Sequence, residues 1–418
     1  MSDAPAHASS QLARVIREGV AETAVSAASH PLWTRLRRLG TELWLDTGDM
    51  DQAAALWSSE FTALTTNNTL LNMEIQKGIY DAWIPEAAAA ARADRPGLDG
   101  QELVLEIAFA LNARHGLRLH ERFGAYVSVE LHTDLAHDAE RSVDYGRRYA
   151  ALCDHFIVKV PLTPAGLIAA RRLEDEGIPV NFTLGFSARQ NHLVARFARP
   201  SWVNVFMGRL GSYVSSEGLG DGAWVGERAT LASQATLIEL RRAGLCSTRQ
   251  IGASMRAGEQ VRTLAGLDVF TMPCGVAEGF LAEDPAADSV VDCTETDYTP
   301  AWAEGVDAEA EGLEALWRVD DAFRAACDRL AELDPARTTA EELVDLLHAS
   351  GQGGIFPRWT ADELAAVAAE GKLPKRERWQ GAVAAGRCGL DALFTVAGLL
   401  AFTKDQAALD ERIRGLVG

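Results

Sequence analysis

The chain has 418 residues, of which 48% are hydrophobic and 24% charged, and its formal net charge is −19 at pH 7. This length suits one large domain with additional segments, or two to three smaller domains. The negative charge argues against nucleic acid or an anionic membrane as partner, although a few arginines in one cleft can still bind a small anion. The dispersed cysteines, the absence of a signal-peptide pattern and the lack of a long apolar run predict a cytoplasmic protein that does not enter a membrane.

Short β-like runs alternate with helical patterns along most of the chain. Residues 10–40 have a helical pattern, and strands are predicted at 42–47, 61–66, 125–131, 155–160, 178–184, 202–207, 250–255 and 268–273. This alternation predicts parallel strands with crossover helices, and eight units favour a (β/α)8 TIM barrel over an open sheet. More than one helix is expected between residues 66 and 125, and the Gly-rich segment 211–224 is predicted to be a mobile loop.

The pattern changes to helix alone after Pro273. Two capping boxes, Thr339 to Glu342 and Thr360 to Glu363, predict helix starts in this region. We therefore predict an N-terminal helical segment at 1–40, a barrel domain at 41–300 and a helical C-terminal extension at 301–418. Two interpretations of the extension stay open: it packs against the barrel, or it forms a subunit interface, for which a homodimer is the simplest assembly.

The stretch "HFIVKVPLTPAG", residues 155–166, places a lysine within a buried strand. Pro161 ends the strand, and Thr163 and Pro164 have the residue types of a helix N-cap and first helical position. Lys159 therefore lies near the C-terminal end of its strand, where TIM barrels have their active sites. A buried lysine is uncommon. It is either paired or reaching for water, or it is a nucleophilic amine.

Other polar residues are predicted near neighbouring strand ends. They are Asp46, Thr65, Asn67, Glu130, Asn181, Thr183, Asn204, Arg209, Ser254 and Arg256. Each alone is typical of a helix cap, a turn or a surface ion pair, but together they surround one end of the predicted barrel. A desolvated amine can form a Schiff base with a ketone, and two carboxylates can move the protons that carbon–carbon cleavage requires. Two arginines and a serine suit a phosphate monoester.

Seven motifs between residues 40 and 275 carry a family resemblance. They are "WLDTGD", "TTNNTLL", "SVEL", "KVPLTPAG", "VNFTLGFSARQ", "FMGRL" and "GASMR". The chain resembles the transaldolases, class I Schiff-base enzymes of the transaldolase/fructose-6-phosphate aldolase superfamily. The resemblance implies transfer of a dihydroxyacetone unit from fructose 6-phosphate or sedoheptulose 7-phosphate to an aldose phosphate, as in the pentose phosphate pathway. It implies sugar phosphates as partners and no metal or organic cofactor.

The resemblance also implies residue roles. Lys159 corresponds to the Schiff-base lysine, and Asp46 to the carboxylate that handles the proton of the C4 hydroxyl. Glu130 and Thr183 correspond to the pair that holds a catalytic water. Within the substrate-binding set, Asn67 and Asn181 are implied to bind the dihydroxyacetone hydroxyls, and Arg209, Ser254 and Arg256 the phosphate. The full implied set is Thr65, Asn67, Asn181, Asn204, Ser187, Arg209, Ser254 and Arg256.

The sequence departs from the family pattern at three positions near the site. Asn68 replaces the proline of "TTNP", Gly185 replaces a larger apolar residue, and Asn204 stands where serine or threonine is usual. These changes leave open a specialised paralogue for an unusual sugar phosphate. Two further interpretations are an aldolase of the same fold and a sugar-phosphate-binding barrel without catalysis.

Overall fold

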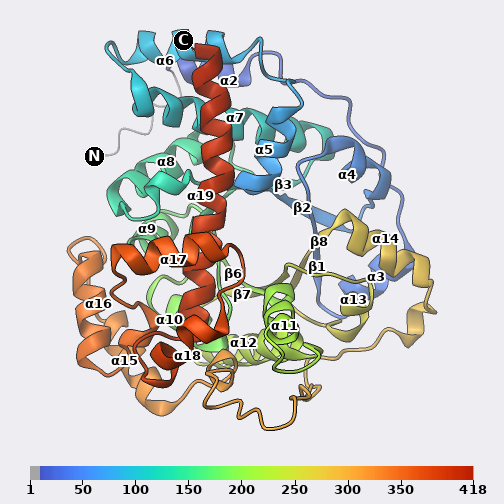
Figure 1. Cartoon of the computed structure of the whole chain (residues 1–418). Helices are drawn as coiled ribbons and strands as arrows, with labels where there is room; N and C mark the ends of the chain where they lie inside the picture. Colours follow the sequence, from blue (N-terminus) through green and yellow to red (C-terminus); the bar gives the residue numbers. More distant parts are fainter. Residues whose placement is uncertain (1–9, 418) are drawn as a thin grey trace.

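The computed structural model describes residues 10–417 and contains eight parallel strands that close into a barrel (Figure 1). Each strand pairs with the next one in chain order, and β8 pairs with β1. The strands are β1 Glu42–Asp46, β2 Phe61–Thr65, β3 Tyr126–Glu130, β4 Phe156–Pro161, β5 Val180–Thr183, β6 Trp202–Phe206, β7 Arg249–Ala253 and β8 Val269–Pro273. They confirm the predicted strands and the (β/α)8 barrel.

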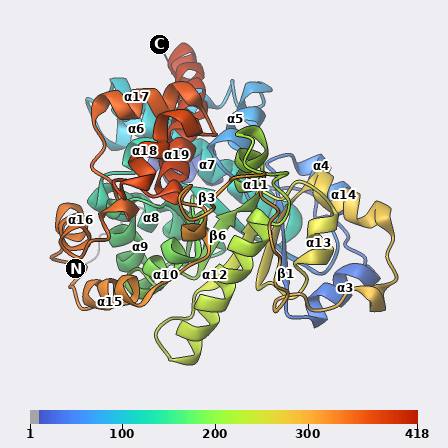
Figure 2. The ribbon, with the colours of Figure 1, turned by 60° about the horizontal axis from the view of Figure 1, so that its bottom comes forward.

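Helices surround the barrel and connect its strands (Figures 1 and 2). They are α4 Met50–Leu56, α5 Asn68–Gln76, α6 Ile84–Asp94, α7 Gly100–Phe123, the 3-10 turn η1 Thr133–Leu135, α8 Ala139–Leu152, α9 Pro164–Asp175, α10 Ala188–Phe197, α11 Met207–Ser216, α12 Val225–Arg242, α13 Glu259–Thr263 and α14 Cys274–Glu283. Three helices between β2 and β3 confirm the expectation of more than one.

The turn after β4 shows how the sequence sets these connections. The Thr163 hydroxyl accepts the N–H of Gly166 at 2.8 Å, and Pro164 occupies the first helical position of α9. Gly166 is required because a Cβ there would lie 2.2 Å from the carbonyl oxygen of Pro161. The strand that carries Lys159 therefore passes into α9 through a tight and fixed turn.

Two predicted segments differ from the structure. The helical prediction for 10–40 is wrong between α2 Gln11–Arg17 and α3 Pro31–Arg38, since Gly19 has a φ of 67° and Ala28 bridges to Ser58. The loop prediction for 211–224 is wrong over its first half, which continues α11. Tyr213 and Val214 are buried there and hold the helix against the core. Residues 1–9 of the N-terminal prediction lie outside the described part of the chain.

The strand register brings polar residues to one level of the barrel. Glu130 on β3 pairs with Lys159 on β4, which in turn pairs with Asn181 on β5. Asp46 on β1 pairs with Thr65 on β2. Paired residues of adjacent strands share one face of the sheet. The register therefore directs these side chains together near the C-terminal ends of the strands, above a core that includes the buried Trp44.

The C-terminal extension packs on the outside of the barrel. After the 3-10 turns η2 Ala287–Ser289 and η3 Glu314–Leu316 it contains α15 Asp321–Ala331, α16 Ala340–Ala349, η4 Gly353–Ile355, α17 Ala361–Glu370, α18 Arg376–Ala384 and α19 Leu390–Val417. Both predicted capping boxes are confirmed at α16 and α17. α15 contacts α10, α16 contacts α9, and the long α19, red in Figure 1, contacts α5 and α7. The proposed domain boundaries and the homodimer stay predictions.

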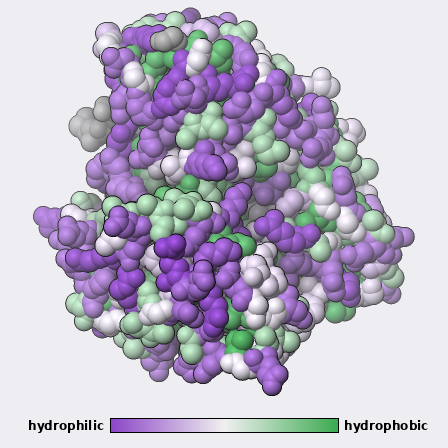
Figure 3. Space-filling model, in the orientation of Figure 1, coloured by the Kyte–Doolittle hydropathy of each residue, from purple (hydrophilic) through white to green (hydrophobic). Residues whose placement is uncertain are grey.

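The molecular surface agrees with the charged composition. The face seen in Figure 3 is mainly hydrophilic, and hydrophobic residues form small separate patches on it. Among residues 10–417, no helix combines the length and the apolar character that crossing a membrane requires.

Candidate active site

A cavity of about 190 Å³ opens at the C-terminal ends of the barrel strands. The predicted site residues that line it are Asp46, Thr65, Asn67, Lys159, Asn181, Asn204, Arg209, Ser254 and Arg256. We call the buried Lys159, Asn181 and Asn204, together with the half-buried Asp46, the cavity floor. Because the four residues come from β1, β4, β5 and β6, the floor is a product of barrel closure.

Lys159 presents its amine to the cavity from a buried position. Its side chain is 5% exposed, its Nζ lies 4.0 Å from Glu130 Oε1, and it donates a hydrogen bond to the carbonyl oxygen of Thr66 at 3.1 Å. The structure thus combines two of the sequence interpretations, a lysine with a carboxylate neighbour and an amine within a cavity. The 4.0 Å separation is longer than a hydrogen bond, so the amine is not held in a tight ion pair with Glu130.

Asp46 is held by the hydroxyl group of Thr65, which in turn contacts a hydroxyl group on β8. Thr65 Oγ1 donates to Asp46 Oδ1 at 2.7 Å and lies 2.6 Å from Thr271 Oγ1. Burial raises the pKa of Asp46 above its ordinary value, and the charge of Lys159 and the Thr65 hydrogen bond offset part of this effect. A carboxyl group in this state can accept and return a proton. Thr271, on β8, was missed by the sequence reasoning although it lies in a predicted strand.

Glu130 lies beside Lys159 behind the cavity lining. Its Oε2 accepts the backbone N–H of Asn68 at 2.9 Å. Burial raises the pKa of Glu130, while Lys159 and the Asn68 N–H favour its charged form. Among the described residues, the buried hydroxyl of Thr183 has no hydrogen-bond partner. The Asn68 contact is specific to this sequence, because a proline at that position would have no N–H to donate.

The other two departures from the family pattern are physically linked. A Cβ at Gly185 would lie 2.3 Å from the carbonyl oxygen of Asn204, so the glycine permits close approach of the chain after β5 to β6. The Gly185 N–H donates to Asn204 Oδ1 at 3.4 Å. Asn204 Nδ2 then donates to Asn181 Oδ1 at 3.3 Å, and Asn181 Nδ2 donates to Ser128 Oγ at 3.1 Å. This chain of amides orients two floor residues.

Arg209, Ser254 and Arg256 form a cationic part of the cavity lining. Arg209 lies in the first turn of α11, and Ser254, directly after β7, has a φ of 59°, an uncommon backbone conformation for a residue with a side chain. A Cβ at Gly208 would lie 2.3 Å from the Ser254 carbonyl oxygen, so this glycine allows α11 to pack against the Ser254 segment. The three predicted phosphate ligands are thereby brought together.

The arginines of this group lack acidic partners within the described part of the chain. No carboxylate within residues 10–417 pairs with the Arg209 or Arg256 side chain, and Arg209 Nη1 is buried without a hydrogen-bond partner in that range. Burial, with a contribution from Arg256, lowers the pKa of Arg209 to about 10. Arg209 is still charged at neutral pH, and a buried cation without a partner is unfavourable. The site can therefore bind an anion.

Asn67 and Ser187 are both predicted substrate ligands, but only Asn67 lines the cavity. Asn67 lines the cavity, and its Oδ1 caps α5 by accepting the Leu70 N–H at 2.8 Å. Ser187 does not line the cavity. Its hydroxyl accepts the Gln190 N–H at 3.1 Å and donates to Asp391 of α19 at 2.6 Å. The predicted substrate contact of Ser187 does not fit this position, because the hydroxyl is occupied in starting α10 and fastening α19.

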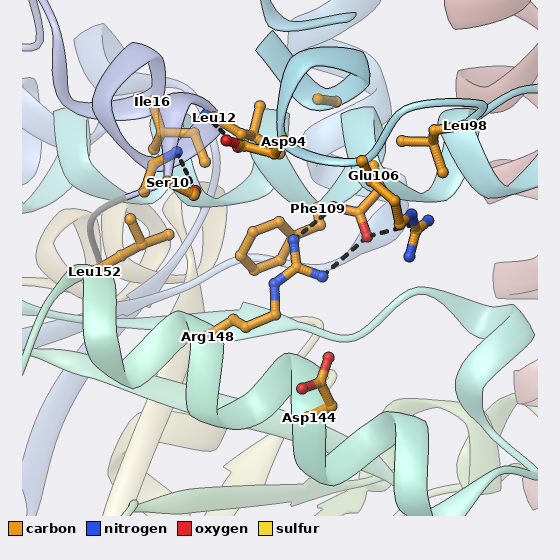
Figure 4. A pocket seen from close by; sticks show the side chains of 13 residues that line it. Ser10, Leu12, Ile16, Asp94, Leu98, Glu106, Phe109, Asp144, Arg148 and Leu152 are labelled. Carbon is orange, nitrogen blue, oxygen red and sulfur yellow. Dashed lines mark hydrogen bonds and ion pairs between the residues drawn. The ribbon is translucent and has the colours of Figure 1, made fainter. Parts of the chain in front are cut away.

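The other cavities and clusters lie away from this site. A cavity of about 290 Å³ is lined by residues of α2, α6, α7 and α8 (Figure 4), where Arg148 is paired with Glu106. Two groups of residues in the described range have the types and spacing of metal ligands, His120 with Cys153 and His155, and His132 with Asp134 and Asp410. None of these residues lines the strand-end cavity. In the second group, His132 Nε2 is already hydrogen-bonded to Asp410 at 3.1 Å.

The fold and the strand-end residues define an aldolase-type (β/α)8 barrel. A family model described as transaldolase/fructose-6-phosphate aldolase matches residues 43–332, and the chain belongs to this family. It is 29% identical over 310 residues to a transaldolase of Xanthomonas euvesicatoria pv. vesicatoria, covering 71% of this chain and 94% of that protein. It is 33% identical over 244 residues to a probable transaldolase of Thermus thermophilus, covering 57% of this chain and 90% of that protein.

Proposed function

We propose that this enzyme is a transaldolase that moves a dihydroxyacetone unit from a ketose phosphate to an aldose phosphate through a Schiff base on Lys159. The observation that carries the proposal is the Lys159 amine, buried in the cavity beside Asp46 and Glu130 and facing the same space as two arginines that have no acidic partner in residues 10–417. Family membership supports the same reaction class. Fructose 6-phosphate and sedoheptulose 7-phosphate are the proposed donors.

The proposed reaction begins with addition of the Lys159 amine to the C2 carbonyl of the ketose. Loss of water from the carbinolamine gives an iminium ion, and Glu130 with the Thr183 hydroxyl would hold the water that exchanges protons in this step. Asp46 then takes the proton of the C4 hydroxyl while the C3–C4 bond breaks. The aldose phosphate leaves, and the electron pair of the broken bond remains on Lys159 as an enamine.

The second half of the reaction reverses these steps with a different aldehyde. The enamine carbon attacks the acceptor carbonyl, Asp46 returns its proton to the new C4 oxygen, and hydrolysis of the iminium ion releases the product ketose. Asn67 and Asn181 would bind the dihydroxyacetone hydroxyls, and Arg209, Ser254 and Arg256 would bind each phosphate in turn. Asp46 must be ionised at the start, so activity should fall as the pH drops through its raised pKa.

Borohydride trapping tests the proposal directly. The protein is incubated with fructose 6-phosphate or sedoheptulose 7-phosphate, reduced, and examined by peptide mass spectrometry. We expect an adduct of dihydroxyacetone size on Lys159, absent in Lys159→Met, whose turnover should fall about 10⁴-fold or more while sugar-phosphate binding persists. Folded wild-type protein that gives no adduct and no turnover with either sugar would contradict the proposal and favour a binding barrel.

The second candidate is an aldolase of the same fold, because the matched family includes fructose-6-phosphate aldolases as well as transaldolases. It would release free dihydroxyacetone or join it to an aldehyde. Measuring free dihydroxyacetone beside transfer to erythrose 4-phosphate separates the two reactions, because a transaldolase retains the enamine until an acceptor arrives. The linked changes at Gly185 and Asn204 make an unusual ketose phosphate a further donor to screen. A cytoplasmic location remains a prediction.

A further inference from the structure

The C-terminal extension contributes two residues to the cavity. Lys372, between α17 and α18, and Phe402 of α19 line the same space as Lys159 and Arg256. Both lie beyond residue 332, where the match to the family model ends. The wall that they form is therefore additional to the part of the chain that defines the family.

The segment that carries Lys372 is held in place at several points. The Lys375 N–H donates to Glu370 Oε2 at 2.8 Å, which closes the segment 370–375 into a turn. Pro374, within this segment, is buried. Glu217, at the C-terminal end of α11, accepts hydrogen bonds from Lys375 Nζ at 3.2 Å and from the Arg376 N–H at 3.1 Å. Since α11 also carries Arg209, these contacts fasten the Lys372 segment to the helix of a predicted phosphate ligand.

The extension also packs on Arg209 itself. The Arg209 guanidinium carbon lies 5.3 Å from the ring centre of Phe206 and 5.9 Å from the ring centres of Phe186 and Phe402. A Cβ at Gly398 of α19 would lie 2.9 Å from Arg209 Nη1, so this glycine permits the close approach of α19. Aromatic faces stabilise a guanidinium group without neutralising it. The extension therefore encloses the arginine and leaves its charge available to a ligand.

Lys372 differs from its neighbour Lys375 in its lack of an acidic partner. Lys375 pairs with Glu217, whereas no carboxylate of residues 10–417 lies within ion-pair distance of Lys372. The outer part of the cavity lining thus holds three cations, Arg209, Arg256 and Lys372. None of them pairs with an acidic residue of 10–417, although the net charge of the chain is −19. A phosphate monoester carries up to two negative charges at neutral pH and matches such a group.

We infer that Lys372 is a third cationic ligand for the phosphate ester of the substrates, so that the C-terminal extension completes the substrate site and strengthens its preference for phosphorylated sugars. The inference rests on the proposed function for the identity of the substrates. The anion site itself can be tested without turnover. Lys372 contacts substrate remote from the reacting carbon, so it contributes to binding and not to the chemical step.

The experiment compares Lys372→Met with Lys404→Met, a matched change of an exposed extension lysine that does not line the cavity. Binding of inorganic phosphate to the resting protein is measured by calorimetry. Steady-state kinetics are then measured with erythrose 4-phosphate and with unphosphorylated erythrose as acceptors. With the ketose phosphate donor saturating, we expect Lys372→Met to weaken phosphate binding and to raise KM for erythrose 4-phosphate by about three- to tenfold, while kcat and the KM for erythrose stay the same.

Controls separate the possible outcomes. Lys404→Met should match the wild type, and Lys372→Arg should retain most phosphate affinity. Equal phosphate affinity in the two Met variants would overturn the inference, and an equal loss with erythrose would assign Lys372 a structural role instead. Lys372-dependent binding of inorganic phosphate without a change in KM for erythrose 4-phosphate would indicate a site for the free anion and also overturn it. Lys372-dependent phosphate binding in a protein that forms no Lys159 adduct would contradict the proposed function alone.

Discussion

The floor and the outer part of the cavity differ in how their polar groups are satisfied. On the floor, Asp46 accepts a hydrogen bond from Thr65 of the neighbouring strand β2, and Lys159 donates to the carbonyl oxygen of Thr66, directly after β2. The Asn181 and Asn204 amides bond to each other. In the outer part, the cationic rim, defined as Arg209, Ser254, Arg256 and Lys372, contains three cations for which no acid is found between residues 10 and 417. The floor is preorganised for chemistry, whereas the rim is incomplete until an anion binds.

The largest expected effect comes from removing one cation of the rim. Arg209→Met should weaken phosphate binding about 100-fold, because it removes charged hydrogen-bond donors from a desolvated site. The unliganded variant should nevertheless unfold at a higher temperature than the wild type. A buried guanidinium without a carboxylate is a cost to the folded state, and methionine fills an aromatic surrounding well.

Arg189→Met is the matched control for that effect, since Arg189 forms a two-point ion pair with the buried Asp391. Breaking this pair should lower the free energy of unfolding by about 3 kcal/mol. Thermal unfolding with and without inorganic phosphate measures both variants. If Arg209→Met lowers the free energy of unfolding as much as Arg189→Met does, Arg209 stabilises the unliganded fold. That result would contradict the assignment of the rim as an anion-binding site.

The next effect is a pH dependence of stability and concerns a buried histidine of α7, outside both the floor and the rim. His115 is buried, with Nε2 donating to the Gly48 carbonyl oxygen at 2.8 Å and Nδ1 accepting from the Tyr80 hydroxyl at 3.0 Å. Burial lowers the pKa of His115 to about 4 from an ordinary 6.5. The folded state thus binds the proton less readily than the unfolded state, so stability is lost as the pH falls from about 6.5 towards 4.

His115→Gln isolates this contribution, because glutamine can donate to Gly48 but does not titrate. Between pH 7 and pH 5, wild-type stability should fall by about 2 kcal/mol more than that of the variant, measured by denaturant unfolding. Asp46 and Glu130 act in the opposite direction, since their raised pKa values favour the folded state at low pH, and the comparison of the two proteins cancels them. Parallel pH curves for the two proteins would contradict the assigned role of His115.

The floor and the rim residues Arg209, Ser254 and Arg256 could be predicted from sequence, whereas Lys372 could not. Strand ends are visible as short apolar runs before turn residues, and closure of the barrel then places Asp46, Lys159 and Asn181 together. The rim depends on packing between segments far apart in sequence, and nothing in the residues around Lys372 and Phe402 indicates that they reach the cavity. The placement of Ser187 has a related cause, because a motif gives the residue type but not the partner of its hydroxyl, which here is Asp391.

The smallest expected effect tests whether the floor is tuned by a feature peculiar to this sequence. Asn68→Pro removes the N–H that Glu130 accepts, and the first position of α5 tolerates proline because Asn67 is already extended, with φ −157° and ψ 170°. Without this donor the charged form of Glu130 is less favoured, so its pKa should rise further. The acid limb of kcat/KM should move to higher pH, with about a threefold loss of rate near neutrality.

Asn68→Ala is the control, since it keeps the N–H and removes only the side chain. A shift of the acid limb in the proline variant alone would assign the effect to the backbone hydrogen bond. A shift of the same size in both variants would assign it to the Asn68 amide, which donates to the Leu131 carbonyl oxygen at 3.5 Å. Phosphate affinity should be unchanged in both proteins, because the rim shares no hydrogen bond with this position within residues 10–417. The floor and the rim would then be separable by mutation, one acting on proton transfer and the other on anion binding.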